Sequence, residues 1–182
     1  MIAGHLGLAG AAHAGRRDSS LVWLLVAGMA PDVVDGLFVL GRYCNPHGLY
    51  SHTIPAATLI AAVTGAIAYF ATDRRVTGVL CVLMTLAHLP LDYVTGRKLF
   101  WPGGELMGLN FYEHPAADFV LEATLAVVGW SLVRRKRDVS LWASGWLALA
   151  AVLAVQGAMN LAGSRGGGMK PTACASFTPR TD

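Results

Sequence analysis

A histidine and an aspartate interrupt one of the most apolar stretches of the chain, the segment LCVLMTLAHLPLDYVTG at residues 80–96. His88 and Asp92 are four residues apart, so they share one face of a helix. Ionisable side chains inside a bilayer are costly unless they pair, bind an ion or line a wet cavity. Since imidazole and carboxylate are both good ligands for zinc or a similar cation, the spacing indicates either a metal site or a buried ion pair.

A second pair of ionisable residues lies in the first long apolar run. Asp32 and Asp35 follow Pro31 and are three residues apart, so they also share a helix face. Like charges this close need a shared cation or proton, unless they only mark the break or end of a span.

The elements that position these residues are membrane helices. The 182-residue chain is 54% hydrophobic and 14% charged, which is typical of a membrane protein. Five apolar runs approach the roughly 20 residues needed to cross a bilayer, and a Gly/Ala-rich stretch at residues 1–15 indicates a short helix. The runs are Ser19–Leu40, Ile54–Thr72, Val76–Thr95, Ala117–Val133 and Leu141–Ala162. We therefore expect an all-α polytopic membrane helix bundle, with five transmembrane spans plus a short N-terminal helix. It forms one domain, 1–162, followed by a disordered tail, 163–182.

The basic residues predict the orientation in the membrane. Alternate connections carry eight positive charges, at residues 16–17, 74–75 and 134–137, whereas the other two connections carry three. The eight belong on the cytoplasmic side. At about 1.5 Å per helical residue, the polar groups lie at one level, roughly 16–27 Å above this basic edge. They are His5, Asp32, Asp35, His88, Asp92 and Asp118. A net charge of +3 without a basic, aromatic-rich patch argues against nucleic-acid binding.

Five ordered motifs resemble the YdjM-like family of bacterial inner-membrane proteins, which are described as metal-dependent hydrolases. They are GHL at 4–6, PDVVD at 31–35, HGLYSHT at 47–53, AHLPLD at 87–92 followed by TG, and LFWPGG at 99–104. The family's usual His-Arg-Gly-x-Thr-His-Ser lacks its arginine here, and its Asp-x-Asp pair becomes Asp-x-x-Asp. The resemblance implies a metal site made by His5, Asp32, Asp35, His52, His88 and Asp92.

A more distant resemblance is to the zinc-dependent phospholipase C and single-strand nuclease superfamily. Those all-helical enzymes use a His-x-x-x-Asp and a later His-x-x-x-Glu. His88 and Asp92 fit the first motif, and His114 with Asp118 approximates the second with a shorter acid. The resemblance implies phosphoester chemistry and adds His114 and Asp118 as further ligands.

Together these observations predict a metal-dependent hydrolase of the inner membrane whose site faces outward. A divalent cation, zinc foremost, would activate water, and Asp35 or His47 would handle the proton. Arg97 or Lys98 would engage the phosphate of a phospholipid or other amphiphilic phosphoester. The expected partners are the lipid bilayer and this substrate, with no oligomeric state implied. A metal or proton transporter, or a non-enzymatic membrane regulatory partner, remains an alternative.

Overall fold

The structure is a computed structural model that describes residues 2–16, 18–135 and 145–164 of the chain. The described part is all-α apart from one two-stranded antiparallel pair, which confirms the expected fold class. The helices are α1 (Ala3–Gly15), α2 (Leu21–Gly28), α3 (Ala30–Leu40), α4 (Ile54–Thr72), α5 (Arg75–Thr95), α6 (Pro115–Arg134) and α8 (Trp146–Ser164). Two 3-10 turns, η1 (Pro46–Gly48) and η2 (Phe111–Glu113), and the strands β1 (Lys98–Leu99) and β2 (Leu106–Met107) lie in the connections. The strands pair Lys98 with Met107 and Leu99 with Leu106.

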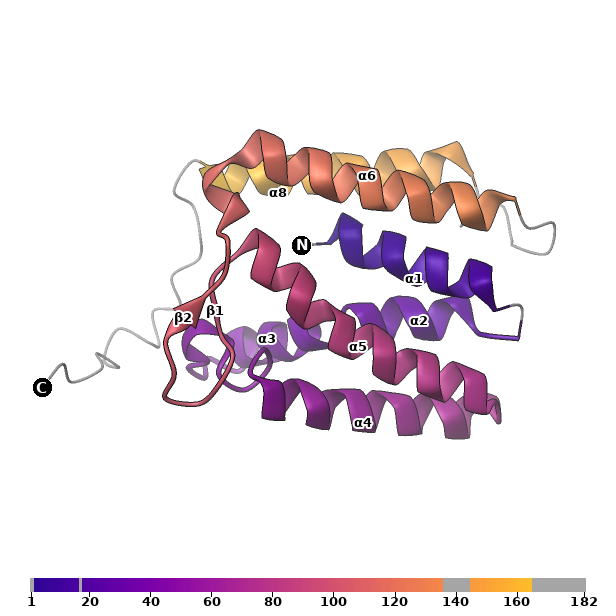
Figure 1. The fold of residues 1–182 in the computed structure, drawn as a ribbon, viewed down its shortest axis with the longest axis horizontal. Coiled ribbons are helices and arrows are strands. Elements are labelled where there is room, and N and C mark those ends of the chain that lie inside the picture. The colour runs from indigo at the N-terminus through magenta and orange to yellow at the C-terminus, as the bar shows by residue number, and fades with distance from the viewer. Residues whose placement is uncertain (1, 17, 136–144, 165–182) are drawn as a thin grey trace, which may run out of the picture.

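Helix α1 lies in the middle of the bundle (Figure 1). Helices α6 and α8 cover one side of it, and α2 and α5 cover the other, with α4 packed outside α5. The N-terminal stretch that the sequence predicts as a short helix is therefore a central element, not an appendage. Its first turn lies at the same end of the bundle as the end of α5, the β pair and η1 (Figure 1).

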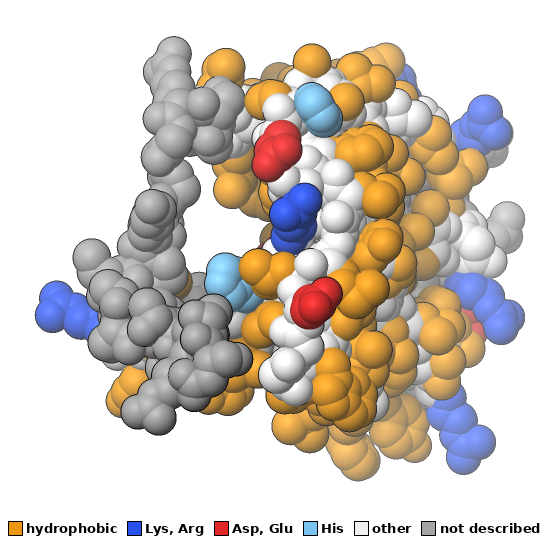
Figure 2. Space-filling view, turned by 60° about the vertical axis from the view of Figure 1, so that its left-hand side comes forward, with side chains coloured by type: hydrophobic (Ala, Val, Ile, Leu, Met, Phe, Trp, Pro, Cys, Tyr) orange, Lys and Arg blue, Asp and Glu red, His pale blue; other side chains and the backbone are white. Residues whose placement is uncertain are grey.

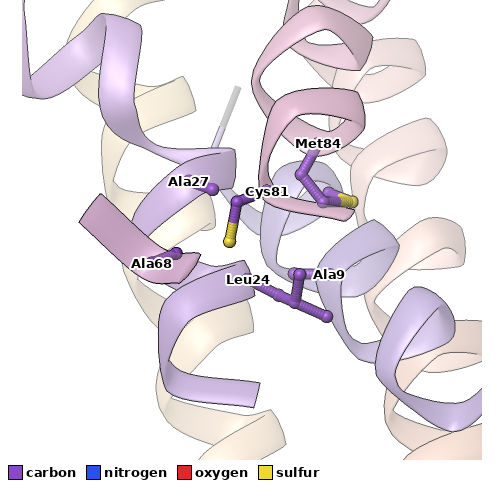
Figure 3. Packing of buried hydrophobic residues seen from close by; sticks show 6 residues of the cluster. All are labelled: Ala9, Leu24, Ala27, Ala68, Cys81 and Met84. Atoms are coloured by element: carbon purple, nitrogen blue, oxygen red, sulfur yellow. The ribbon is translucent and has the colours of Figure 1, made fainter. Parts of the chain in front are cut away.

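Small side chains hold the helices together. The core between α1, α2, α4 and α5 consists of alanines, one leucine, one cysteine and one methionine (Figure 3). Against α6, Gly7 and Gly129 face each other so closely that a Cβ on Gly129 would lie 1.9 Å from the Gly7 carbonyl oxygen. Glycines allow backbones to approach in this way in membrane bundles, where burial from water does not drive association. The contact fixes α1 on α6.

The first predicted span is broken. Ser19–Leu40 forms α2 and α3, which meet at an angle of 56° around Met29. The cause is Pro31, because proline has no N–H to continue the helical hydrogen bonds and its ring clashes with the preceding turn. The break agrees with the alternative that the acidic pair marks a break of this apolar run, and it frees carbonyls at the end of α2.

The other expected spans have different outcomes. Among the described residues, α4, α5 and α6 are long and apolar enough to cross a membrane, and the bent α2–α3 pair makes up to four. Five spans are thus not confirmed, since the apolar part of α8, Trp146–Leu161, is shorter. The beginning of the predicted span 141–162 and nearly all of the predicted tail 163–182 lie outside the described residues. Helix α4 exposes Leu59, Val63, Ile67 and Phe70 along one face, as a lipid-facing helix does.

Most of the described arginines lie at the end of the bundle opposite the β pair, whereas Arg42 and Arg97 lie at the β-pair end. Arg16 ends α1, Arg74 and Arg75 join α4 to α5, and Arg134 ends α6. A hydrogen bond of 3.1 Å from the Arg74 guanidinium to the Asp18 carbonyl ties two of these turns together. The basic connections that the sequence predicts on one side of the membrane therefore lie together at one end of the folded bundle.

This arrangement leads to a topology prediction. We expect Glu105→Cys, in the loop between the strands, to react with a membrane-impermeant maleimide in intact cells, and Arg135→Cys to react only after permeabilisation, because basic ends stay cytoplasmic. Labelling of the unsubstituted chain measures the background from its native cysteines. Reaction of Arg135→Cys in intact cells would invert the orientation.

Candidate metal centre

Four side chains from three separate elements meet near the C-terminal end of α5. Asp32 comes from α3, His52 from the segment between η1 and α4, and His88 and Asp92 from α5. Each offers one nitrogen or oxygen atom, and these four atoms lie within 4.8 Å of one another. The i, i+4 spacing of His88 and Asp92 places both on the buried face of α5, as the sequence predicts.

Five of the six distances between these four atoms are close to the edges of a tetrahedron around a metal ion, and the sixth, between Asp32 and Asp92, is at most 4.8 Å. His52 Nε2 lies 3.2 Å from His88 Nε2 and 3.0 Å from Asp92 Oδ2, and His88 Nε2 lies 3.4 Å from that oxygen. Asp32 Oδ1 is 3.6 Å from each imidazole nitrogen. Ligands bonded to zinc at about 2.0–2.1 Å in tetrahedral geometry are separated by about 3.3 Å. The centre thus has the ligand types and the spacing that a zinc-like cation requires.

The broken helix orients His88. Pro31 has no N–H for the Ala27 carbonyl, and this carbonyl instead accepts a hydrogen bond of 3.0 Å from the Thr85 hydroxyl. The next carbonyl, of Gly28, accepts a hydrogen bond of 2.9 Å from His88 Nδ1. A carbonyl can only accept, so Nδ1 carries the proton and Nε2 presents its lone pair to the centre. Metal-binding histidines are commonly fixed in this way by an outer partner.

A polar network orients His52. Its Nδ1 lies 3.3 Å from Asp35 Oδ2 and 2.7 Å from Ser51 Oγ. The Ser51 hydroxyl and the Asn45 amide both donate to Asp35 Oδ1. Asp35, which the sequence predicts as a ligand, thus lies behind His52 and outside the four-residue group. Gly48, at a φ of 77°, lies so close that a Cβ there would be 2.9 Å from His52 Nδ1.

Burial separates a closed side of the centre from an open one. His52, His88 and Asp92 are almost fully buried, whereas about a third of the Asp32 side chain, 32%, is exposed. Burial by itself lowers the pKa of His52, but hydrogen bonds with the carboxylates of Asp32 and Asp92 raise the pKa above its ordinary value. Protons therefore compete with a cation for this imidazole, and acid pH should weaken metal binding.

His5 lies beside the four. Its ring stacks on His88 with 3.9 Å between ring centres, and its Nε2 is 4.0 Å from Asp92 Oδ1. That Asp92 oxygen is buried and accepts no hydrogen bond from the described part of the chain. The first turn of α1 is held by Glu122 on α6, whose Oε2 accepts a 3.1 Å hydrogen bond from the Ala3 amide. A buried acid at this helix start satisfies its N–H groups and favours its dipole.

Of the remaining predicted site residues, one lies beside the group and four do not. Lys98 is close, with its Nζ 3.7 Å from Asp92 Oδ2. His47, Arg97 and His114 are exposed at this end of the bundle, where charged and histidine side chains are scattered among hydrophobic ones (Figure 2). Asp118 is fully buried and accepts a 3.0 Å hydrogen bond from Asn160, on the α6–α8 side of α1. His114 and Asp118 are thus not brought to the four-residue group.

Several residues that shape the centre were not predicted from the sequence. Asn45, Ser51, Thr85 and Gly28 act through hydrogen bonds to the site or its supporting carbonyls. For Ser51 a signal existed, because it lies inside the HGLYSHT motif at 47–53 next to His52. Asn45, Thr85 and Gly28 lie in no motif that marks them, and their contacts arise only where α3 turns away from α2.

The donor set fits a divalent cation. Two neutral imidazoles and two carboxylates balance a charge of +2, and nitrogen with oxygen donors at these distances suits zinc. Catalytic zinc sites keep one coordination position for water or substrate, whereas structural sites are closed by four protein ligands. The exposed side of Asp32 is where such a position can open.

The comparison with protein families supports this picture of a membrane protein. Neither the curated proteins nor the solved structures include a significant match to the chain. The model of the family described as YdjM inner membrane protein matches residues 1–162, a range that contains the described helices α1 to α6 and the apolar part of α8. The chain therefore belongs to the YdjM inner membrane protein family.

Proposed function

We propose that the protein is a metal-dependent hydrolase of the inner membrane that cleaves a phosphoester in a phospholipid or another amphiphile. The observation that carries the proposal is the near-tetrahedral group of Asp32, His52, His88 and Asp92, closed on three members and open at Asp32. Three buried donors would hold a cation while the exposed Asp32 leaves the fourth position to water or substrate, which is the arrangement of catalytic zinc sites.

The proposed roles of the residues follow from their positions. A bound cation, with zinc as the best fit, would acidify water and polarise the oxygen of the bond to be cleaved. His52, His88 and Asp92 would hold it from the buried side, with His5 packed against His88. Asp32, on the open side, has room to accept a proton from incoming water. Lys98 has its ammonium group beside the centre, where it would bind the phosphate of the substrate.

The surface around the centre supports an amphiphilic substrate. At this end of the bundle, α3, the β pair and the turns expose large apolar side chains. They are Leu37, Leu40, Tyr43, Tyr50, Trp101, Leu106, Met107, Leu109 and Tyr112. Tyrosine and tryptophan favour the headgroup level of a bilayer. We infer that the site opens at the outer leaflet, where a lipid headgroup would reach it.

The decisive experiment is an activity measurement. In detergent or proteoliposomes, the protein should hydrolyse at least one member of a panel of phospholipids and soluble phosphoesters. Activity should disappear with a chelator, return on addition of zinc, and fall at acid pH because only neutral imidazole binds metal. Asp35→Asn should lower activity about 10–100-fold, as removal of an outer partner of a metal ligand does.

The matched control is Asp18→Asn, which makes the same change at an exposed position in the turn between α1 and α2. Chelator-insensitive activity, or equal activity in Asp35→Asn and Asp18→Asn, would contradict the mechanism. Metal flux into proteoliposomes without turnover would instead support a transporter. Metal-free protein without either activity would favour a regulatory partner.

A further inference from the structure

An apolar groove of about 200 Å³ follows the seam between α1 and α6, and none of its lining residues belongs to the metal centre. Its other walls come from α2 and α8, and it lies in the half of the bundle nearer the arginines. Prominent lining residues are Leu21, Leu25, Trp130, Val133, Leu149 and Val152. The groove is larger than the roughly 150 Å³ apolar cavity that binds benzene, so it accepts a length of hydrocarbon chain.

Small residues create this space. Gly7 and Gly10 bring α1 onto α6, and Ala126 and Ala148 line the groove where larger side chains would fill it. The lining is almost entirely apolar, so ordered water has few partners there. Since the groove lies within the membrane-spanning part of the bundle, a lipid acyl chain is the occupant that matches its chemistry.

A cationic side chain stands at the inner end of the groove. The Arg134 guanidinium lies 5.1 Å from the ring centre of Trp130, which lines the groove, and 4.6 Å from that of Trp146. Arg134 forms no salt bridge with the part of the chain that the structure describes. Stacking holds the planar guanidinium while its N–H edge stays available, and this edge matches the geometry of a phosphate group.

We propose that this groove binds one anionic phospholipid from the leaflet at the arginine-bearing end, with an acyl chain along α1 and α6 and the phosphate on Arg134. Trp130 and Trp146 would lie at the level of its glycerol and headgroup, where aromatic residues are favoured. The site is separate from the metal centre and does not depend on its chemistry.

Native mass spectrometry of the delipidated full chain tests the proposal, with titration by phosphatidylglycerol and by phosphatidylcholine. The unsubstituted protein should bind one phosphatidylglycerol about five-fold or more tighter than phosphatidylcholine, as one basic side chain at an anionic lipid implies. Arg134→Gln should abolish this preference. Ala148→Phe, which fills the groove, should weaken the binding of both lipids.

Two controls make the same changes elsewhere. Arg75→Gln removes an arginine at the same end of the bundle, and Ala150→Phe enlarges an exposed residue of α8. Both should bind phosphatidylglycerol as the unsubstituted protein does. The proposal would be overturned if Arg75→Gln and Arg134→Gln lost the preference for phosphatidylglycerol equally, or if Ala148→Phe bound phosphatidylglycerol as tightly as the unsubstituted protein does. If Ala148→Phe does not yield monodisperse protein, the exposed Arg134→Gln decides the question alone.

Discussion

His52→Ala and His88→Ala should each purify with less than about a tenth of the zinc that the unsubstituted protein retains. Each removes one of the two imidazoles that would hold the cation and leaves the carboxylates of the group with a single neutral partner. Since loss of an outer partner alone costs about 10–100-fold in metal affinity, loss of a ligand should cost at least the upper end of that range. Elemental analysis after detergent purification, followed by zinc titration against a competing chelator, measures the effect.

The chain supplies its own controls for this experiment. His47→Ala and His114→Ala remove exposed histidines that lie outside the group, so they should retain the full metal content. The zinc content of Ser51→Ala and Asp35→Asn should lie between those of the two classes of variant, because Ser51 and Asp35 contact His52 without being part of the four-residue group. Equal zinc in His88→Ala and His114→Ala would show that the group is not the metal site, whatever activity the protein has.

The sequence predicted the level of the polar residues but not their direction around the bundle. Counting residues from the basic clusters gave His88, Asp92 and Asp118 a similar depth along the bundle axis. Depth alone does not say on which side of the bundle a side chain lies. The position of a side chain around the bundle axis depends on which helices pack on α1. Asp118, on α6, faces Asn160 on one side of α1, whereas Asp92, on α5, faces the metal centre on the other.

The acidic pair shows a second limit. Asp32 and Asp35 share a helix face in sequence, and both were predicted as ligands. In the structure α3 leaves α2 at 56°, so that Asp32 faces His88 while Asp35 lies behind His52, beside Ser51 and Asn45. Pro31 in the sequence signals a break, but the direction of the bend is set by packing against α4 and α5. The family motif at residues 47–53 pointed to His52, which the structure brings into the four-residue group. Helix spacing alone could not do so, because His52 lies in a connection and meets the group only through packing of the whole chain.

Gly129→Ala should destabilise the protein more than any other single methyl addition in α6. The new Cβ would lie 1.9 Å from the Gly7 carbonyl oxygen and 2.7 Å from the Gly7 Cα. These are backbone atoms, so no side-chain rotation relieves the clash and α1 must move away from α6. Overpacking of this kind costs about 3 kcal/mol or more, which corresponds to a fall in Tm of roughly 6–12 °C for a chain of this size.

The position of α1 also links this contact to the metal centre. Gly7 is two residues from His5. A Cβ on Gly7 would itself lie 2.2 Å from the Leu125 carbonyl oxygen, so the backbones of α1 and α6 are in close contact at both glycines. Gly129→Ala should therefore also lower zinc affinity, through displacement of His5 and the first turn of α1 that Glu122 holds. Gly36→Ala is the matched control, because a Cβ there meets no atom within 4 Å. Thermal unfolding in detergent should separate the two variants, and the same Tm for both would mean that α1 and α6 do not pack through their backbones.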